Sequence, residues 1–266
     1  MRHSLAVILV FALSACSVLD PLPNGDAPGA IKANSAEELY ADAKAFLNEG
    51  EYNSALKRYE ALQARYPYGR YAQQAMLEMA YTYYRQDEPE PAIATTDRFI
   101  KQFPNNPNLD YAYYLKGLAS FNGEISALGR LGNQDMSERD PSMPQRSFEA
   151  FKELVTRYPN SRYAPDARLR MQYLVNMLAK HDLNIARYYH RRHAYVAAVN
   201  RAQNILQTYP NSPATRDALA IMVQCYDAMG MPQLRDDTQR ILTQNGGPSV
   251  TLLSDQGEQP WWQIWK

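Results

Sequence analysis

Between residues 35 and 245, apolar residues recur at the spacings of amphipathic helices, and these helices come in pairs. The recurring positions of the first pair are Leu39, Ala43, Phe46, Tyr52, Ala55, Tyr59 and Leu62. Small residues stand where the two helices of a pair approach closely, as with Ala43 facing Ala55 and Ala80 facing Ala92. The pattern predicts an all-α chain built from helical hairpins.

A turn motif marks the end of each hairpin. It occurs as Tyr66-Pro67, Phe103-Pro104, Tyr158-Pro159 and Tyr209-Pro210, and an alanine follows eight residues after each proline. Proline cannot continue a helix and disfavours the helical conformation in the residue before it. The polar turn that follows, Asn-Ser in two copies, suits the start of the next helix. Successive prolines are 37, 55 and 51 residues apart, so the longer spacings equal the first plus insertions of 18 and 14.

These spacings resemble the tetratricopeptide repeat, with about five units over residues 35–245. The resemblance implies a superhelical solenoid, because such hairpins must stack to bury their apolar faces. Residues 123–144, which contain several glycines and prolines, are expected to form a loop, whereas residues 176–193 contain neither and are expected to prolong a helix. In the fifth unit Arg235 replaces the expected alanine, which suits a capping repeat at the C-terminal end.

The first 34 residues have the features of an export signal followed by a tether. Leu5 to Leu13 is a nine-residue apolar run, too short to span a bilayer as a helix. The string Leu13-Ser14-Ala15-Cys16 resembles the bacterial lipobox, in which the cysteine is lipidated; the alternative is an ordinary signal peptide with an incidental cysteine. We expect a signal peptide over residues 1–15 and a lipidated, flexible tether over 16–34. Ser17 after the cysteine implies, by the same resemblance, the outer membrane.

Composition and motifs narrow the classes of function. The chain has 28 basic and 28 acidic residues, which argues against a general nucleic-acid binder. Only two cysteines are present, one in the leader and Cys225 in an apolar helical pattern, so no disulfide framework is expected. His190 and His193 lack a third ligand nearby, so we expect no metal site. No nucleophile or phosphate-loop motif occurs, so we expect a protein that is not an enzyme and carries no cofactor besides the lipid on Cys16.

In this repeat class the first helix of each hairpin lines the concave face. The residues expected there are Tyr40, Lys44, Tyr81, Tyr84, Arg85, Tyr111 and Tyr114. Tyrosine combines a large apolar area and a low conformational-entropy cost with a polar tip, and the two cations can bind a carboxylate. We therefore expect a groove for a peptide that ends in an aromatic residue and a carboxylate. The alternative is that these tyrosines only pack adjacent helices.

Longer strings point to one family. The lipobox, the repeats and the strings Asp97-Arg98-Phe99-Ile100 and Ala214-Thr215-Arg216-Asp217-Ala218-Leu219 resemble the BamD family of the outer-membrane β-barrel assembly machinery. The resemblance implies an adaptor that faces the periplasm and contacts a BamA-like barrel protein, other assembly lipoproteins and precursor outer-membrane proteins. It favours Arg201 and Arg216 as partner-docking residues. The alternative function is a scaffold for cell-wall or cell-division proteins, because the Tol-Pal-associated division coordinator shares the turn motif.

The C-terminal tail, residues 246–266, departs from the repeats. The chain's three tryptophans all lie there, as Trp261, Trp262 and Trp265, after Gly246, Gly247 and Pro248. Tryptophans that are absent from the core cannot stabilise the core. The tail is either a free end or a segment that rests at the membrane interface, on a partner or in a groove of the solenoid itself.

Overall fold

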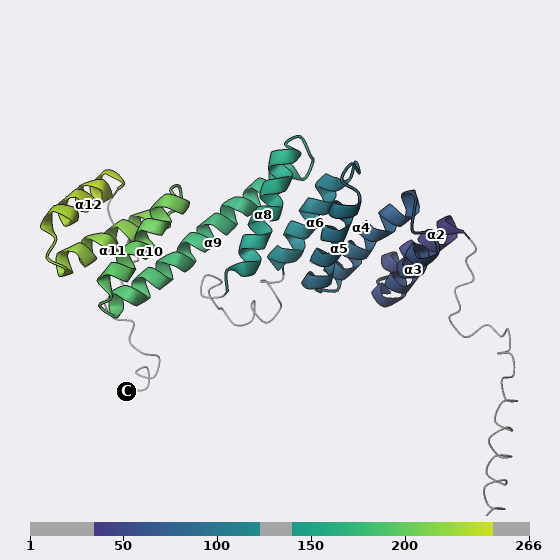
Figure 1. Ribbon diagram of the computed structural model, residues 1–266, viewed down its shortest axis with the longest axis horizontal. Coiled ribbons are helices and arrows are strands. Elements are labelled where there is room, and N and C mark those ends of the chain that lie inside the picture. Colours follow the sequence, from purple (N-terminus) through teal and green to yellow (C-terminus); the bar gives the residue numbers. More distant parts are fainter. Residues whose placement is uncertain (1–34, 123–139, 247–266) are drawn as a thin grey trace, which may run out of the picture.

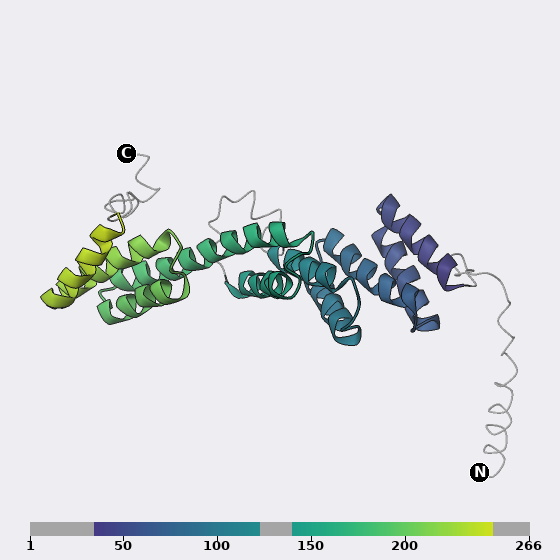
Figure 2. The same cartoon turned by 90° about the horizontal axis from the view of Figure 1, so that it is seen from above.

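The computed structural model describes residues 35–122 and 140–246, and in these two ranges the chain forms α-helices and turns without any strand. The helices are α2 (Ala36–Glu49), α3 (Tyr52–Arg65), α4 (Arg70–Arg85), α5 (Pro89–Gln102), α6 (Leu109–Asn122), α8 (Ser142–Arg157), α9 (Ala164–Arg191), α10 (Tyr195–Thr208), α11 (Ala214–Ala228) and α12 (Pro232–Gln244). They follow one another along an elongated body (Figures 1 and 2). The expected all-α solenoid is confirmed. Cys16 and the tryptophan tail lie outside the described residues.

Four helices end in the same way, with a capping residue that immediately precedes a turn proline. The residues there are Tyr66, Phe103, Tyr158 and Tyr209, and their φ angles are −131°, −127°, −128° and −128°. Each donates its N–H to the carbonyl four residues earlier, at 2.7 to 2.9 Å. The proline that follows disfavours the helical conformation at these positions and cannot donate a hydrogen bond of its own, so the helix stops after this last hydrogen bond. The turn motif therefore sets where the second helix of each of these four hairpins ends.

The carbonyls that accept these four hydrogen bonds belong to core residues. They are Leu62, Phe99, Leu154 and Ile205, and each side chain is 0% exposed. The small residues expected at the helix crossings, among them Ala43, Ala55, Ala80 and Ala92, are also fully buried. Because α3 contacts α4 and α5 contacts α6, this core continues from one hairpin into the next.

The two insertions differ in structure. α9 runs for 28 residues from Ala164 to Arg191, which confirms the prolonged helix; it packs against α8 near its start and against α10 and α11 further along (Figure 1). In the other insertion, residues 123–139 lie outside the described residues, and the expected loop over 123–144 is wrong at its end. α8 begins at Ser142, and Pro144 is accommodated in its first turn, where no intrahelical N–H is needed. No helix in the described ranges has the length and apolar character to cross a membrane.

The third hairpin is held together at a close approach between α6 and α8. A methyl group added to Gly117 of α6 would overlap the ring of Phe151 on α8, a residue that is fully buried. The hydroxyl of Ser147 donates to the carbonyl of Gly117 at 2.9 Å, also in the interior. Glycine is therefore required at this crossing for space rather than for an unusual backbone angle.

We expect Gly117→Ala to lower the free energy of unfolding by about 1–3 kcal/mol, the typical cost of overpacking a filled core. Alanine is favoured over glycine inside a helix by about 1 kcal/mol, so the sign of the change separates packing from helix propensity. Urea unfolding followed by circular dichroism measures the change. Gly117→Ala should lower the free energy of unfolding less in a chain that already carries Phe151→Leu than in the parent chain, because the smaller side chain leaves room for the methyl group. A Gly117→Ala chain at least as stable as the parent would contradict the close approach.

Candidate peptide-binding groove and docking surface

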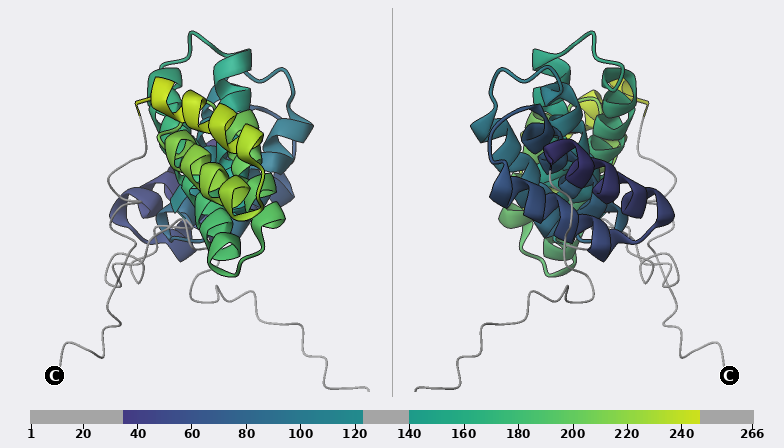
Figure 3. Two further views of the ribbon diagram at one scale, coloured as in Figure 1. Left: turned by 90° about the vertical axis from the view of Figure 1, so that its left-hand side faces the viewer. Right: turned by 90° about the vertical axis from the view of Figure 1, so that its right-hand side faces the viewer.

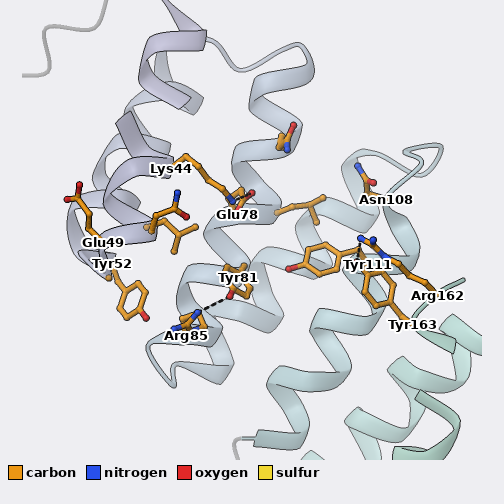
Figure 4. A pocket seen from close by; sticks show the side chains of 15 residues that line it. Lys44, Glu49, Tyr52, Glu78, Tyr81, Arg85, Asn108, Tyr111, Arg162 and Tyr163 are labelled. Atoms are coloured by element: carbon orange, nitrogen blue, oxygen red, sulfur yellow. Dashed lines mark hydrogen bonds and ion pairs between the residues drawn. The ribbon is translucent and has the colours of Figure 1, made fainter. Parts of the chain in front are cut away.

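A groove of about 710 Å³ opens along the N-terminal half of the solenoid. Its lining comes mainly from α2, α4 and α6, with Tyr52 at the start of α3 and the turn that precedes α9 (Figure 4). α2 contacts α4 and α4 contacts α6, so the first helices of three successive hairpins form one wall. The residues that line it include Lys44, Leu47, Leu77, Glu78, Tyr81, Arg85, Tyr111, Arg162 and Tyr163.

Four of the seven residues expected in a groove line it, namely Lys44, Tyr81, Arg85 and Tyr111. The other three tyrosines are not among the lining residues. The ring of Tyr40 lies 5.6 Å from that of Tyr71, and Tyr84 packs against a buried cluster that includes Ile93. The ring of Tyr114 stacks on Tyr163 at 4.7 Å. Tyrosines of the first helices therefore serve both purposes, and packing accounts for these three.

Lys44 forms an ion pair inside the groove. Its Nζ lies 2.6 Å from Oε1 of Glu78, whose side chain is only 16% exposed. Tyr40 donates its hydroxyl to the same oxygen at 3.4 Å. Burial, together with the charge of Glu78, raises the pKa of Tyr40 to about 12. Tyr40 therefore stays protonated at neutral pH and keeps its hydrogen bond, and the charge of Lys44 is largely compensated by Glu78.

Arg85 is the cation that α4 contributes to the groove, and it is exposed to solvent. Its guanidinium donates to the hydroxyl of Tyr81 at 2.9 Å and lies 5.8 Å from the ring centroids of Tyr52 and Tyr81. No carboxylate of residues 35–122 or 140–246 forms an ion pair with Arg85. Arg85 is thus held by aromatic neighbours and retains its positive charge for a ligand.

Arg162 and Tyr163 contribute the opposite part of the lining, although they were not among the residues expected in the groove. The guanidinium of Arg162 donates to the hydroxyl of Tyr163 at 2.8 Å and lies 4.9 Å from its ring centroid. Arg70 and Tyr71 repeat this geometry at 3.0 and 4.8 Å. The signal was present as the string Arg-Tyr-Ala, which occurs at both places after the turn proline.

Glu78 was also not among the residues expected in the groove. It shares a face of α4 with Tyr81, three residues later, and with Arg85, four residues after Tyr81. With Glu78 and Lys44 compensating each other, the excess charge of the labelled groove residues comes from Arg85 and Arg162, offset in part by Glu49 at the rim (Figure 4). Burial also raises the pKa of Tyr111 well above its usual range, so its hydroxyl is a neutral donor. Such a groove can stack aromatic side chains and bind a carboxylate.

Arg201 lies in the C-terminal half, on α10. Its side chain is 46% exposed, and Nη1 lies 3.5 Å from Oδ1 of the nearly buried Asp182 on α9. Asn204 donates to the other oxygen of this carboxylate at 2.9 Å. Arg201 also lines a shallow hollow of about 360 Å³ with Tyr189, Ala197, Asn200 and Asn204. Asp182 thus orients Arg201 at the edge of a surface depression.

The other basic residues of this region have different surroundings. Arg187 pairs with the buried Asp217 at 3.1 Å and joins α9 to α11. Burial lowers the pKa of His190, as do the nearby His193 and Arg191. Arg216 does not line the hollow beside Arg201; it lies on α11, next to Gly246. Within the described residues no three His, Cys, Asp or Glu side chains gather as a metal site would require.

Comparison with known proteins places this chain in a family. The model of the YfiO family, described as outer membrane lipoprotein, matches residues 32–241. A relative from Neisseria meningitidis, named outer membrane protein assembly factor BamD, is 43% identical over 264 residues and 98% of each chain. A relative of that name from Xylella fastidiosa is 41% identical over 209 residues, which are 79% of this chain and 71% of the relative. Among solved structures, the MamA protein aligns over 76% of this chain and 85% of its own with a TM-score of 0.39 and 15% identity.

The matched range contains both surfaces described above. It begins just before α2 and ends within α12, so the groove and the Arg201 hollow both fall inside it. The resemblance to the BamD family that the sequence strings indicated is confirmed. This chain belongs to the YfiO family of outer membrane lipoproteins.

Proposed function

We propose that this protein is a non-enzymatic adaptor of the outer-membrane β-barrel assembly machinery, held at the periplasmic face of the outer membrane by lipid on Cys16. Its groove binds precursor outer-membrane proteins, and the surface around Arg201 docks a BamA-like barrel protein, with other assembly lipoproteins in the same complex. Family membership supports the assembly role, because the relatives are named outer membrane protein assembly factors. The observation that carries peptide binding is the tyrosine-lined groove in which Arg85 and Arg162 keep their charge.

The chemistry of the groove favours one kind of peptide end. A terminal aromatic ring can pack against Tyr81 or Tyr111, while its carboxylate accepts hydrogen bonds from Arg85 or Arg162. Lys44 is a weaker candidate for the carboxylate, because Glu78 already occupies its ammonium group at 2.6 Å. This narrows the expectation that either Arg85 or Lys44 binds the carboxylate.

A binding role without catalysis fits the described side chains. Cys225, the cysteine within the described residues, is fully buried, and burial raises the pKa of its thiol to about 11. It is therefore a neutral thiol without access to a substrate. Tyr111 in the groove is neutral as well, because burial raises the pKa of its hydroxyl, which suits a hydrogen-bond donor rather than a general base.

The groove is tested with a ten-residue synthetic peptide that ends in phenylalanine with a free carboxylate. We expect the double variant Arg85→Glu, Arg162→Glu to bind this peptide about tenfold more weakly or worse, because a charge-assisted hydrogen bond contributes about 1.5–3 kcal/mol. Fluorescence anisotropy of a labelled peptide measures the affinity.

Two controls accompany this measurement. Arg98→Glu on α5 changes an exposed arginine that lines a different hollow, and it should leave the affinity unaltered. The same peptide with a C-terminal amide should bind the parent chain more weakly. Equal affinity of the parent and the double variant for the free-acid peptide would remove the two arginines from the site.

The docking surface is tested by affinity purification from detergent-solubilised membranes. We expect Arg201→Gln to reduce recovery of a large β-barrel protein, because it removes an exposed charge that Asp182 orients toward the partner. Arg157→Gln, on α8, is the matched control, since Arg157 is also exposed and also paired within the chain, to Glu153. Recovery of Tol-Pal or peptidoglycan enzymes instead of a barrel protein would contradict the assembly role.

The anchor is tested by fractionation. Cys16→Ser removes the thiol that a lipid would modify, so we expect the chain to leave the outer-membrane fraction when no other assembly component is present. Immunoblotting of separated membrane and soluble fractions measures its distribution. Retention of the variant in the outer-membrane fraction under these conditions would refute anchoring through Cys16.

A further inference from the structure

α12 forms the last layer of the solenoid, and its outer side is open. It packs on α11 through Thr238 and Leu242, which are buried. Viewed from this end of the molecule, α12 stands in front of α11 with no further helix before it (left view of Figure 3). Terminal repeats of solenoids usually carry a polar outer face, because no neighbour covers them.

This end is not fully polar. Leu234 and Ile241 are each 47% exposed, and Met231, just before the helix, is 44% exposed. Leu234 and Ile241 are seven residues apart and therefore lie on the same side of α12, next to the seam with α11. These are three of the eight large apolar side chains that are exposed within the described residues. A further repeat would bury such positions, but α12 is the last helix of the described chain.

A cation lies where the chain leaves α12. A Cβ added to Gly246 would be 3.6 Å from Nη1 of Arg216, so this guanidinium lies beside the first residue after the helix and its cap. Arg216 forms no ion pair with a carboxylate of the described residues. The sequence that follows Gly246 contains two acidic residues, Asp255 and Glu258, which are complementary to this cation.

The same segment carries the chain's three tryptophans, Trp261, Trp262 and Trp265. Trp261 lies fifteen positions after Gly246, and a segment of that length spans up to about 50 Å when extended. α12 has 13 residues and is therefore about 20 Å long. The tail is long enough to return over the whole outer side of α12.

We propose that residues 247–266 fold back onto the open end of their own solenoid, where the tryptophans cover Leu234 and Ile241 and an acidic residue pairs with Arg216. The tail then takes the place that the first helix of another repeat would occupy. Tryptophan supplies a large apolar area from few residues, which suits a short segment that must cover an exposed helix face.

Tryptophan fluorescence tests this directly, because every tryptophan of the chain lies in the tail. The full chain with Cys16→Ser, purified without detergent, should emit at a shorter wavelength than in denaturant and be quenched less by acrylamide. Leu234→Glu combined with Ile241→Glu should move the emission toward the denatured value while circular dichroism stays unchanged. The milder pair Leu234→Ser and Ile241→Ser should act in the same direction and serves if the glutamates disturb the helix. Val196→Glu, at a side chain that is 64% exposed on α10, is the matched control and should have no effect.

Four outcomes would overturn the proposal. If the parent chain emits at the wavelength of the denatured chain, the tail is free. If the α12 substitutions leave the emission unchanged, the tryptophans are shielded by one another or by another surface. A shift that grows with protein concentration would assign the surface to a second copy of the chain. A shift that appears only with vesicles of phosphatidylethanolamine and phosphatidylglycerol would assign the tail to the membrane.

Discussion

A hairpin of two short helices has an apolar face that it cannot bury by itself, and the stacking of each hairpin on the next satisfies this requirement. The turn prolines make the stacking regular, because each stops a helix at the same distance after a fully buried side chain, as at Leu62, Phe99, Leu154 and Ile205. Local backbone chemistry and long-range packing therefore meet in the same residues. Where the spacing changes, as in the third hairpin, a specific contact such as that of Gly117 with Phe151 maintains the packing.

The groove is formed by the surface of the first helices that is not buried when the hairpins stack. The first helices of three hairpins lie side by side, and their side chains are divided between the contacts that join the helices and the surface that remains open. Tyrosine suits this division, since its ring can pack against a neighbour while its hydroxyl meets an ion or a hydrogen-bond partner. Tyr114 shows the packed case and Tyr81 the open one, although both are tyrosines on first helices.

The repeat pattern was sufficient for the features that depend on neighbours in sequence. The helix ends, the buried alanines and the extension of α9 all follow from spacing and from the conformational limits of proline. The groove was only partly predictable, because Arg162 reaches it from a turn more than forty residues after Tyr111 in the sequence, and the shared wall exists only after stacking. The ion pair of Lys44 with Glu78 joins two hairpins, so no single repeat indicates that this lysine is already occupied.

The length of α9 determines how the C-terminal hairpins are oriented relative to the N-terminal hairpins. One continuous helix of 28 residues is about 42 Å long, and it belongs to the packing of α8 at one end and of α10 and α11 at the other. Its length therefore sets both the distance and the relative rotation between these two groups of helices. Each residue inserted into it would move the C-terminal hairpins by about 1.5 Å and turn them by about 100° around its axis. The number of residues in α9 thus sets the direction in which the Arg201 surface faces relative to the groove.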